Sequence, residues 1–294
     1  MTVLVALTPG ERGSAALHLG TLLARSAGDS VVVAAVVPTP WPPSPFPGEA
    51  EYLQHAERSA EQALARARAQ LGDALPAEFV VQHGRSVAAG LLEATLENRA
   101  DLVVLGSSAE GLIGRVGLGA VAHRLLHSTD VPVVLAPRGF TADGVRVHRV
   151  TAAFGPRDAE SDLVRRALGV ADGFGATLRV ASFAVRPPTG LSGTIEESAE
   201  DLVVERWAAQ VAALVADSLG EEAAGAVATR METVVGQGNT WAEAVGSVPW
   251  AAGDLLVVGT SSSAISSFLL GSHASKVARS SPVPVYLVPR SLPG

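Results

Sequence analysis

Short runs of hydrophobic residues, many of them β-branched, recur along the chain between longer segments in which apolar and polar residues mix. Such runs are typical of strands buried on both faces of a parallel sheet, and the mixed segments are typical of the helices that cover it. In the first half we predict strands at Val3–Leu7, Val31–Val37, Phe79–Gln82, Leu102–Leu105 and Val133–Ala136. Helices are predicted between the capping residue Ser14 and the stop at Gly28, and over Glu49–Leu71, Val87–Asn98 and Val121–His127.

The second half of the chain repeats this order of elements. Its predicted strands are Val150–Phe154, Thr177–Phe183, Met231–Val235, Leu255–Val258 and Val285–Val288. Its predicted helices are Asp162–Ala171, Glu196–Ser218, Trp241–Ser247 and Ser275–Ser280. Strands that alternate with helices favour right-handed crossovers and helices on both faces of a sheet. The fold class that we predict is therefore α/β, with two Rossmann-like doubly wound domains, each a five-stranded, mainly parallel sheet flanked by helices.

Two strands and the loops behind them occur twice in the sequence. The segment Ala100–Ser108 returns 153 positions later as Gly253–Ser261, and Gly119-Ala120 returns 152 positions later as Gly271-Ser272. The Val-Pro-Val strand that closes each half follows at the same offset of 152. Ordered correspondences at nearly one offset indicate a duplicated domain. We expect domains at residues 1–140 and 147–294, with a linker at about 139–148, where glycines and alternating charge interrupt the pattern.

The composition of the chain limits the classes of partner and of chemical site that we expect. It is 48% hydrophobic and 17% charged, with a net charge of −7, so it carries no basic footprint for nucleic acid or for an anionic membrane surface. The chain has no cysteine, which excludes disulfides, thiolate metal sites and thiol nucleophiles. No basic leader precedes the first strand, and no apolar run approaches the length of a bilayer span. We expect a cytoplasmic protein.

Candidate chemistry lies in the loops after the first and fourth strands of each half, because ligands bind at the carboxyl ends of strands in an open parallel sheet. The loop Gly106–Ala120 is rich in glycine and leads into a helix, and such a loop can bring backbone amides close to a phosphate. It is not a Walker loop, because no Gly-Lys-Ser/Thr follows. The alternative is that these glycines only allow a strand and a helix to pack closely.

Over essentially the whole chain, this duplicated strand–loop–helix–Val-Pro-Val pattern resembles the universal stress protein family. ATP-binding members of that family carry Gly-x-x-Gly, nine residues, then Gly-Ser/Thr after the fourth strand, and an aspartate at the end of the first strand. The resemblance implies candidate nucleotide pockets at Thr8, Gly106, Ser107, Gly119 and Ala120 in the first half, and at Gly259, Thr260, Gly271 and Ser272 in the second.

Departures from the family pattern fall on the residues that would bind a nucleotide. In the first half, Ala109 replaces the second glycine, Ala120 replaces the hydroxyl residue and Thr8 replaces the aspartate. In the second half, Ser262 replaces a glycine, Gly155 replaces the aspartate and the loop is one residue shorter. We therefore expect degenerate nucleotide pockets.

The last strand of each half is predicted to lie at a sheet edge, because proline is tolerated there and an unpaired apolar edge invites another strand. Universal stress proteins commonly associate through this strand. We expect the two halves of the chain to pair through it as a pseudo-dimer. Dimerisation of whole chains is a further expectation that follows from the same resemblance.

The histidines and the proline-rich segment give weaker indications of a functional site. His123 and His127 are one helical turn apart but have no third ligand nearby, and His273, next to Ser272, is the histidine nearest to a candidate pocket. The segment Pro38–Pro47 is too rich in proline for regular structure and is either a surface excursion, a partner contact or a lid.

The function expected from the sequence is that of a tandem, non-enzymatic universal stress protein acting in stress adaptation, without catalytic residues, a metal or an obligatory cofactor. The alternative is a relative that binds ATP in one or both halves. An enzyme of the related adenine-nucleotide hydrolase group is the least favoured, because the pocket loops offer only Glu110 and Arg115 as charged side chains.

Overall fold

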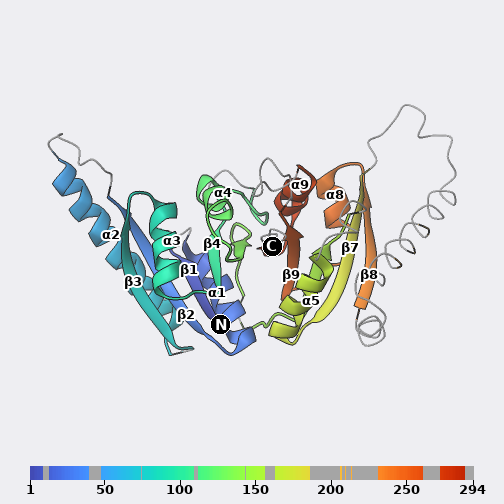
Figure 1. Cartoon of the computed structure of the whole chain (residues 1–294), viewed down its shortest axis with the longest axis horizontal. Coiled ribbons are helices and arrows are strands. Elements are labelled where there is room, and N and C mark those ends of the chain that lie inside the picture. Colours follow the sequence, from blue (N-terminus) through green and yellow to red (C-terminus); the bar gives the residue numbers. More distant parts are fainter. Residues whose placement is uncertain are drawn as a thin grey trace.

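The two halves of the chain form one ten-stranded sheet between two layers of helices (Figure 1). The computed structural model describes residues 1–8, 13–39, 48–73, 75–108, 112–142, 144–155, 163–185, 206, 209, 213, 231–260 and 272–288. The first-half strands are β1 (Thr2–Ala6), β2 (Ser30–Pro38), β3 (Ala77–Gly84), β4 (Leu102–Gly106) and β5 (Val133–Ala136). Those of the second half are β6 (Arg149–Ala153), β7 (Thr177–Val185), β8 (Met231–Gly238), β9 (Asp254–Gly259) and β10 (Val285–Val288).

The strand order is β3-β2-β1-β4-β5-β10-β9-β6-β7-β8, and all neighbours within each half are parallel. Each half therefore has the doubly wound order expected from the sequence, with the reversal of strand order between β1 and β4 or between β6 and β9. The helices are α1 (Gly13–Ala27), α2 (Glu49–Leu71), α3 (Val87–Glu97), α4 (Ala120–Leu126), α5 (Leu163–Phe174), α8 (Trp241–Gly246) and α9 (Ser272–Ser280).

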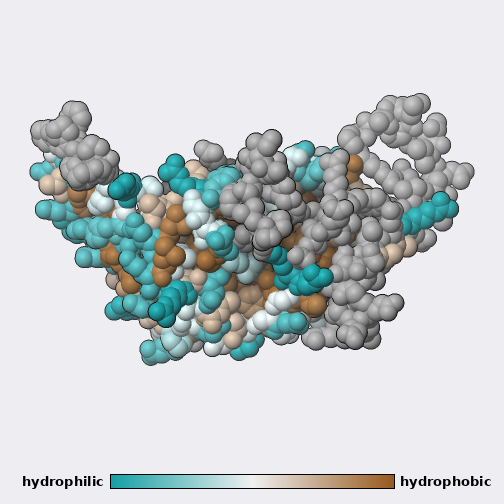
Figure 2. Space-filling model, in the orientation of Figure 1, coloured by the Kyte–Doolittle hydropathy of each residue, from teal (hydrophilic) through white to brown (hydrophobic). Residues whose placement is uncertain are grey.

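Alternation of side chains along the strands produces two separate cores. Residues such as Val3, Val5 and Val104 pack on one face against α1, α2 and α5. Their neighbours in sequence, such as Leu4 and Val103, pack on the other face against α3, α4, α8 and α9. Because both faces are covered, the central strands are apolar at nearly every position, which is why they could be identified as short hydrophobic runs. Hydrophilic side chains cover much of the described surface over α2 and α3, with hydrophobic ones showing between them (Figure 2).

The two halves join through β5 and β10, which pair antiparallel with Val133 opposite Leu287, Val134 opposite Tyr286 and Leu135 opposite Val285. This confirms the expected pairing of the last strands within one chain. A second contact lies in the helix layer, where α1 packs against α5. The Ser26 hydroxyl at the end of α1 also accepts a hydrogen bond of 2.8 Å from the amide of Val147 in the linker.

Most predicted elements are present, with different ends. Both β3 and β8 extend farther than predicted, to Gly84 and Gly238. The expectation that regular structure stops before Pro38 is wrong, because Pro38 is the last residue of β2. Beyond Ala34, β2 pairs with β3 alone, so the missing amide of Pro38 can face the side without a strand. The predicted helix Glu196–Ser218 lies outside the described residues except for positions 206, 209 and 213, which are helical. Of the proline-rich segment after Pro38, only Thr39 is among the described residues.

A buried cluster of charged residues lies on the second-half sheet, where the sequence suggested only a core. Arg179 of β7 is 0% exposed and donates to the Thr151 hydroxyl at 3.0 Å and to the Pro249 carbonyl at 2.9 Å. Its guanidinium also lies 4.7 Å from the centre of the Trp250 ring. Asp254, 1% exposed, accepts hydrogen bonds from Arg149 at 3.0 and 2.7 Å and lies 3.5 Å from Arg179. These bonds to Asp254 raise the pKa of Arg149 above its ordinary value.

We expect Asp254→Asn to lower the free energy of unfolding by on the order of 3–5 kcal/mol, because it leaves the buried Arg179 charge without a counter-ion. Denaturant unfolding measures the effect. The matched control is Asp101→Asn in the repeat, since Asp101 is exposed and accepts from the Thr2 amide at 2.6 Å. Equal losses in the two variants would show that the arginine pair does not depend on Asp254.

Burial raises the pKa of Tyr286 to about 12, and the negative charge of Asp101 adds to this effect. The unfolded chain ionises Tyr286 near its ordinary value of about 10, so the stability that neutral Tyr286 contributes is complete below pH 10 and is lost as the pH rises to about 12. We expect Tyr286→Phe to reduce the loss of stability between pH 9 and 11.5 by on the order of 1–2 kcal/mol. Urea unfolding across this pH range tests the expectation, and parallel pH curves for the two proteins would contradict it.

Candidate functional site

Two candidate ligand mouths lie where the strand order reverses, at the carboxyl ends of β1 and β4 in the first half and of β6 and β9 in the second. Because β5 and β10 run antiparallel, the strands of the two halves point in opposite directions. The two mouths therefore open at opposite ends of the strands, one at each of the two rims of the sheet that the strand ends form. We call them the first mouth and the second mouth.

Three predicted residues of the first mouth lie at or just beyond the ends of the neighbouring strands β1 and β4. Gly106 is the last residue of β4, Ser107 follows it, and Thr8 is exposed just beyond the end of β1. Thr8 has a hydroxyl where ATP-binding relatives would place a carboxylate. Ala109, Glu110 and Gly111 of the same loop lie outside the described residues.

The hydroxyl of Ser107 is engaged within the protein. Its Oγ donates to the carbonyl of Ala136 at 2.6 Å and accepts from the amide of Gly117 at 2.9 Å, with the Arg115 carbonyl 3.3 Å away. A serine hydroxyl has one proton to donate, and here that proton goes to Ala136. Ser107 therefore holds the loop after β4 against the end of β5. It does not present a free donor to the mouth.

Gly119 and Ala120 form the entry to α4. Gly119 has extended backbone, and a Cβ at this position would lie 3.2 Å from the Cβ of Ser108, so close packing favours glycine here. Ala120 begins the helix with an exposed methyl group, and no side chain caps the helix. Gly119 thus allows the loop after β4 to pack closely against the entry to α4.

The second mouth is lined differently. Phe154, 2% exposed, follows β6 and precedes Gly155, so no carboxylate lies at the end of this strand. Gly259 ends β9 beside Leu163 of α5, and Thr260, 2% exposed, donates its amide to the Val288 carbonyl at 3.2 Å. Ser272 is exposed at the start of α9, whereas Gly271 lies outside the described residues.

Aromatic and cationic side chains gather beside the second mouth, at the start of α8 and in the first two turns of α9. The rings of Trp241 and His273 are 5.3 Å apart, and Nζ of Lys276 lies 5.9 Å from the centre of the Trp241 ring. Lys276 is the one lysine in the sequence. The sequence pointed to His273 but missed Trp241 and Lys276, because the facing of two helices cannot be seen from spacing within either one.

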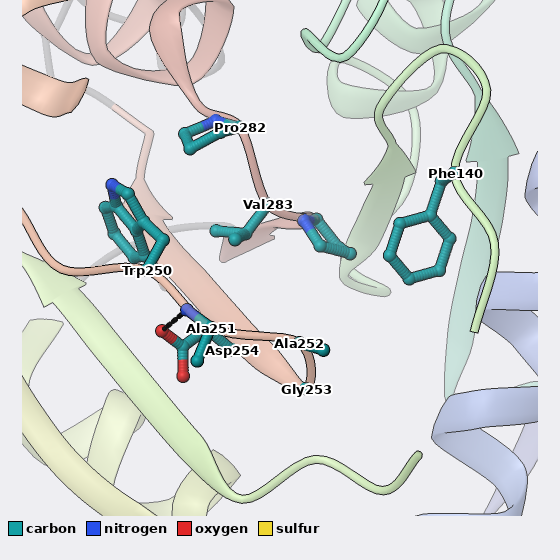
Figure 3. Close-up of a pocket in the computed structure, with 9 residues that line it drawn as sticks. Phe140, Trp250, Ala251, Ala252, Gly253, Asp254, Pro282 and Val283 are labelled. Carbon is teal, nitrogen blue, oxygen red and sulfur yellow. Dashed lines mark hydrogen bonds between the residues drawn. The ribbon is translucent and has the colours of Figure 1, made fainter. Parts of the chain in front are cut away.

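A third concave feature lies at the junction of the halves, away from the second mouth, at the amino ends of β9 and β10. Its volume is about 290 Å³, and its side chains include Phe140 of the linker, Trp250 and Val283. In Figure 3, Phe140 and Trp250 lie on opposite sides of the cavity, and Asp254 accepts a hydrogen bond from the Ala251 amide at 2.9 Å. The carboxylate of Asp254 is also occupied by the two arginines, so the lining offers apolar contact more than free polar groups.

Neither a metal cluster nor a membrane span emerges from the described part of the chain. There, no group of three or more histidine, aspartate or glutamate side chains is placed to hold an ion. Likewise, no helix within those residues combines the length and the apolar character that crossing a bilayer requires.

We expect Ser107→Ala to lower the free energy of unfolding by about 1–3 kcal/mol, because the Ala136 carbonyl and the Gly117 amide both lose their partner. Ser108→Ala is the matched control, since it removes a neighbouring hydroxyl that lies outside this bond network. Urea unfolding of the three proteins provides the comparison. A Ser107→Ala variant as stable as the control would show that the hydroxyl is dispensable for the loop.

Comparison with known proteins agrees with the duplicated fold. The model of the universal stress protein family matches residues 1–137 and again residues 146–289. Universal stress proteins of Mycobacterium tuberculosis and Mycobacterium bovis are each 36% identical over 98% of this chain and 100% of their own length.

Solved structures show the same fold at lower identity. A universal stress protein from Archaeoglobus fulgidus superposes with a TM-score of 0.59 at 18% identity, covering 98% of this chain and 96% of that one. A putative universal stress protein from Pseudomonas aeruginosa gives a TM-score of 0.50 at 15% identity, over 98% of this chain and 92% of its own. With two family matches in tandem and relatives that it matches over their full length, the chain belongs to the universal stress protein family as a two-domain member.

Proposed function

We propose that this tandem universal stress protein acts without catalysis, through its conformation and its contacts, and that its nucleotide pockets are degenerate. The observation that carries the proposal is the state of the first mouth. Ser107 is bonded to Ala136 and Gly117, and Thr8 and Ala120 stand where the family pattern has an aspartate and a hydroxyl residue. The side chains that would recognise a ribose and a phosphate there are replaced or engaged elsewhere.

The size of the effect follows from the missing contacts. A hydrogen bond to a charged group contributes about 1.5–3 kcal/mol, so the loss of the phosphate contact at Ala120 and of the carboxylate contact at Thr8 weakens binding at least about a hundredfold. Backbone amides of the loop remain as phosphate donors. We therefore expect weak and rapidly reversible binding of adenine nucleotides at the first mouth.

A second candidate function is nucleotide binding at the second mouth. Ser272 keeps the family's hydroxyl and is exposed at the start of α9, and the cationic side chain of Lys276 lies one helical turn away. Gly155 still lacks the carboxylate that would fix the ribose. This mouth is thus the better candidate of the two for an anionic ligand.

Back-substitution tests the degeneracy. We expect Thr8→Asp/Ala120→Ser to bind Mg-ATP at least about a hundredfold more tightly than the natural sequence, measured by isothermal titration and by the rise of the melting temperature. Thr8→Asn/Ala120→Gly is the control, because it changes the same positions without adding a carboxylate or a hydroxyl. The proposal is wrong if the unsubstituted protein retains near-stoichiometric ATP after purification, as mass spectrometry of released small molecules would show.

Two further measurements separate the candidates. Ser272→Ala should abolish any residual Mg-ATP binding if the second mouth is responsible for it, and should leave binding unchanged if the first mouth is. Phosphate release from Mg-ATP should stay at the buffer background in the unsubstituted protein. Hydrolysis above that background, lost in a mouth variant, would contradict a non-catalytic role.

A further inference from the structure

The segment of residues 112–118, which follows the first mouth, crosses the end of β5 toward the second half. We call it the bridging segment. Its backbone is fixed to the end of the first half, because the Gly114 amide donates to the Arg138 carbonyl at 2.9 Å and the Arg138 amide donates to the Arg115 carbonyl at 3.0 Å. Val116 and Leu118 are buried in the core beneath α4. These anchors set the direction in which the Arg115 side chain leaves the backbone.

Arg115 extends into the second half. Its Nη1 donates to the carbonyl of Ser280, the last residue of α9. Carbonyls in the last turn of a helix have no partner within the helix, and this end carries the negative part of the helix dipole. A guanidinium is therefore well matched to it. Arg115, which the sequence offered as a charged side chain for the first mouth, thus links the two halves.

The two ends of this link are the two mouths. On one side, Ser107 bonds to Gly117 of the bridging segment and lies 3.3 Å from the Arg115 carbonyl, so the first mouth and Arg115 share one hydrogen-bond network. On the other side, α9 begins at Ser272 beside the second mouth and ends at the contact with Arg115. A single short helix thus separates Arg115 from the second mouth.

The sequence repeat carries this arginine in one of its two copies. At the repeat offsets of 152 and 153, the counterparts of Arg115 are Ser267 and Phe268, which carry no charge. The second copy of the repeat therefore has no arginine at the position equivalent to Arg115. A structural contact conserved by the duplication would be present in both copies, whereas this one distinguishes them.

We propose that Arg115 is a positioning residue that couples the two mouths, holding the loop of the first mouth and the end of α9 in one arrangement. Ordering of the bridging segment by a ligand at the first mouth then stabilises α9, and through it the entry to the second mouth. The ligand part of this statement rests on the proposed function, because it takes the mouths to be the nucleotide sites. The link itself does not.

Hydrogen exchange of the ligand-free full chain tests the link. We expect Arg115→Gln to speed amide exchange about tenfold in two separate peptides, one covering residues 112–118 and one covering residues 274–281, while β1 and α1 keep their rates. Arg124→Gln is the control, because it removes the same charge from an exposed position on α4. Faster exchange in the first peptide alone, or in neither, overturns the proposal, and a uniform rise over β1 and α1 shows a general loss of stability instead of a link and also overturns it.

Coupling is tested on the Thr8→Asp/Ala120→Ser variant, whose first mouth is restored. Mg-ATP should slow exchange in residues 274–281 at least threefold when Arg115 is present, and should not change it when Arg115→Gln is added. Slowing that survives Arg115→Gln, or no slowing although titration shows ATP bound, means that the mouths are not coupled through this residue. If the variant binds no ATP, the degeneracy proposal fails and the ligand-free experiment alone decides the link.

Discussion

The antiparallel pairing of β5 with β10 is the contact on which the rest of this molecule depends. It uses only three opposed residue pairs, yet it makes one sheet of two duplicated halves and fixes the opposite directions of their strands. An unpaired apolar strand would expose backbone donors and acceptors at the edge of each half. Because both strands belong to one chain, their backbone donors and acceptors are paired without a second molecule. The outermost strands of the resulting sheet are β3 and β8.

The sequence predicted the elements, the duplication and the joining of the last strands, because each leaves a local pattern or a fixed offset. Gly106 and Gly259 are found at the ends of β4 and β9, as expected. The bonding of Ser107 could not be predicted, since its partner Ala136 lies on another strand. Nor could the buried Arg179, because a single charged residue within an apolar strand gives no indication that Asp254 and Trp250 will meet it. Both the bonding of Ser107 and the burial of Arg179 depend on contacts between elements, which the spacing of residues along the chain does not reveal.

The two halves differ most where their sequences suggest equivalence. The aspartate at the start of the fourth strand differs between the halves: Asp101, just before β4, is exposed and its carboxylate accepts from the Thr2 amide, whereas Asp254, the first residue of β9, is a buried counter-ion. The first mouth has a methyl group at Ala120, whereas the second has Ser272 close to His273 and Lys276. A common backbone therefore carries two distinct electrostatic environments, and each has its own expected response to substitution.

Covalent fusion of the two halves has an evolutionary consequence. In a homodimer built on the same strand pairing, every substitution is imposed on both subunits at once, and a contact such as that of Arg115 with Ser280 would arise in duplicate. Within one polypeptide, a mutation alters a single copy. Selection can then preserve the sequence of one half while the other half changes, so a difference between the two halves is inherited within a single gene.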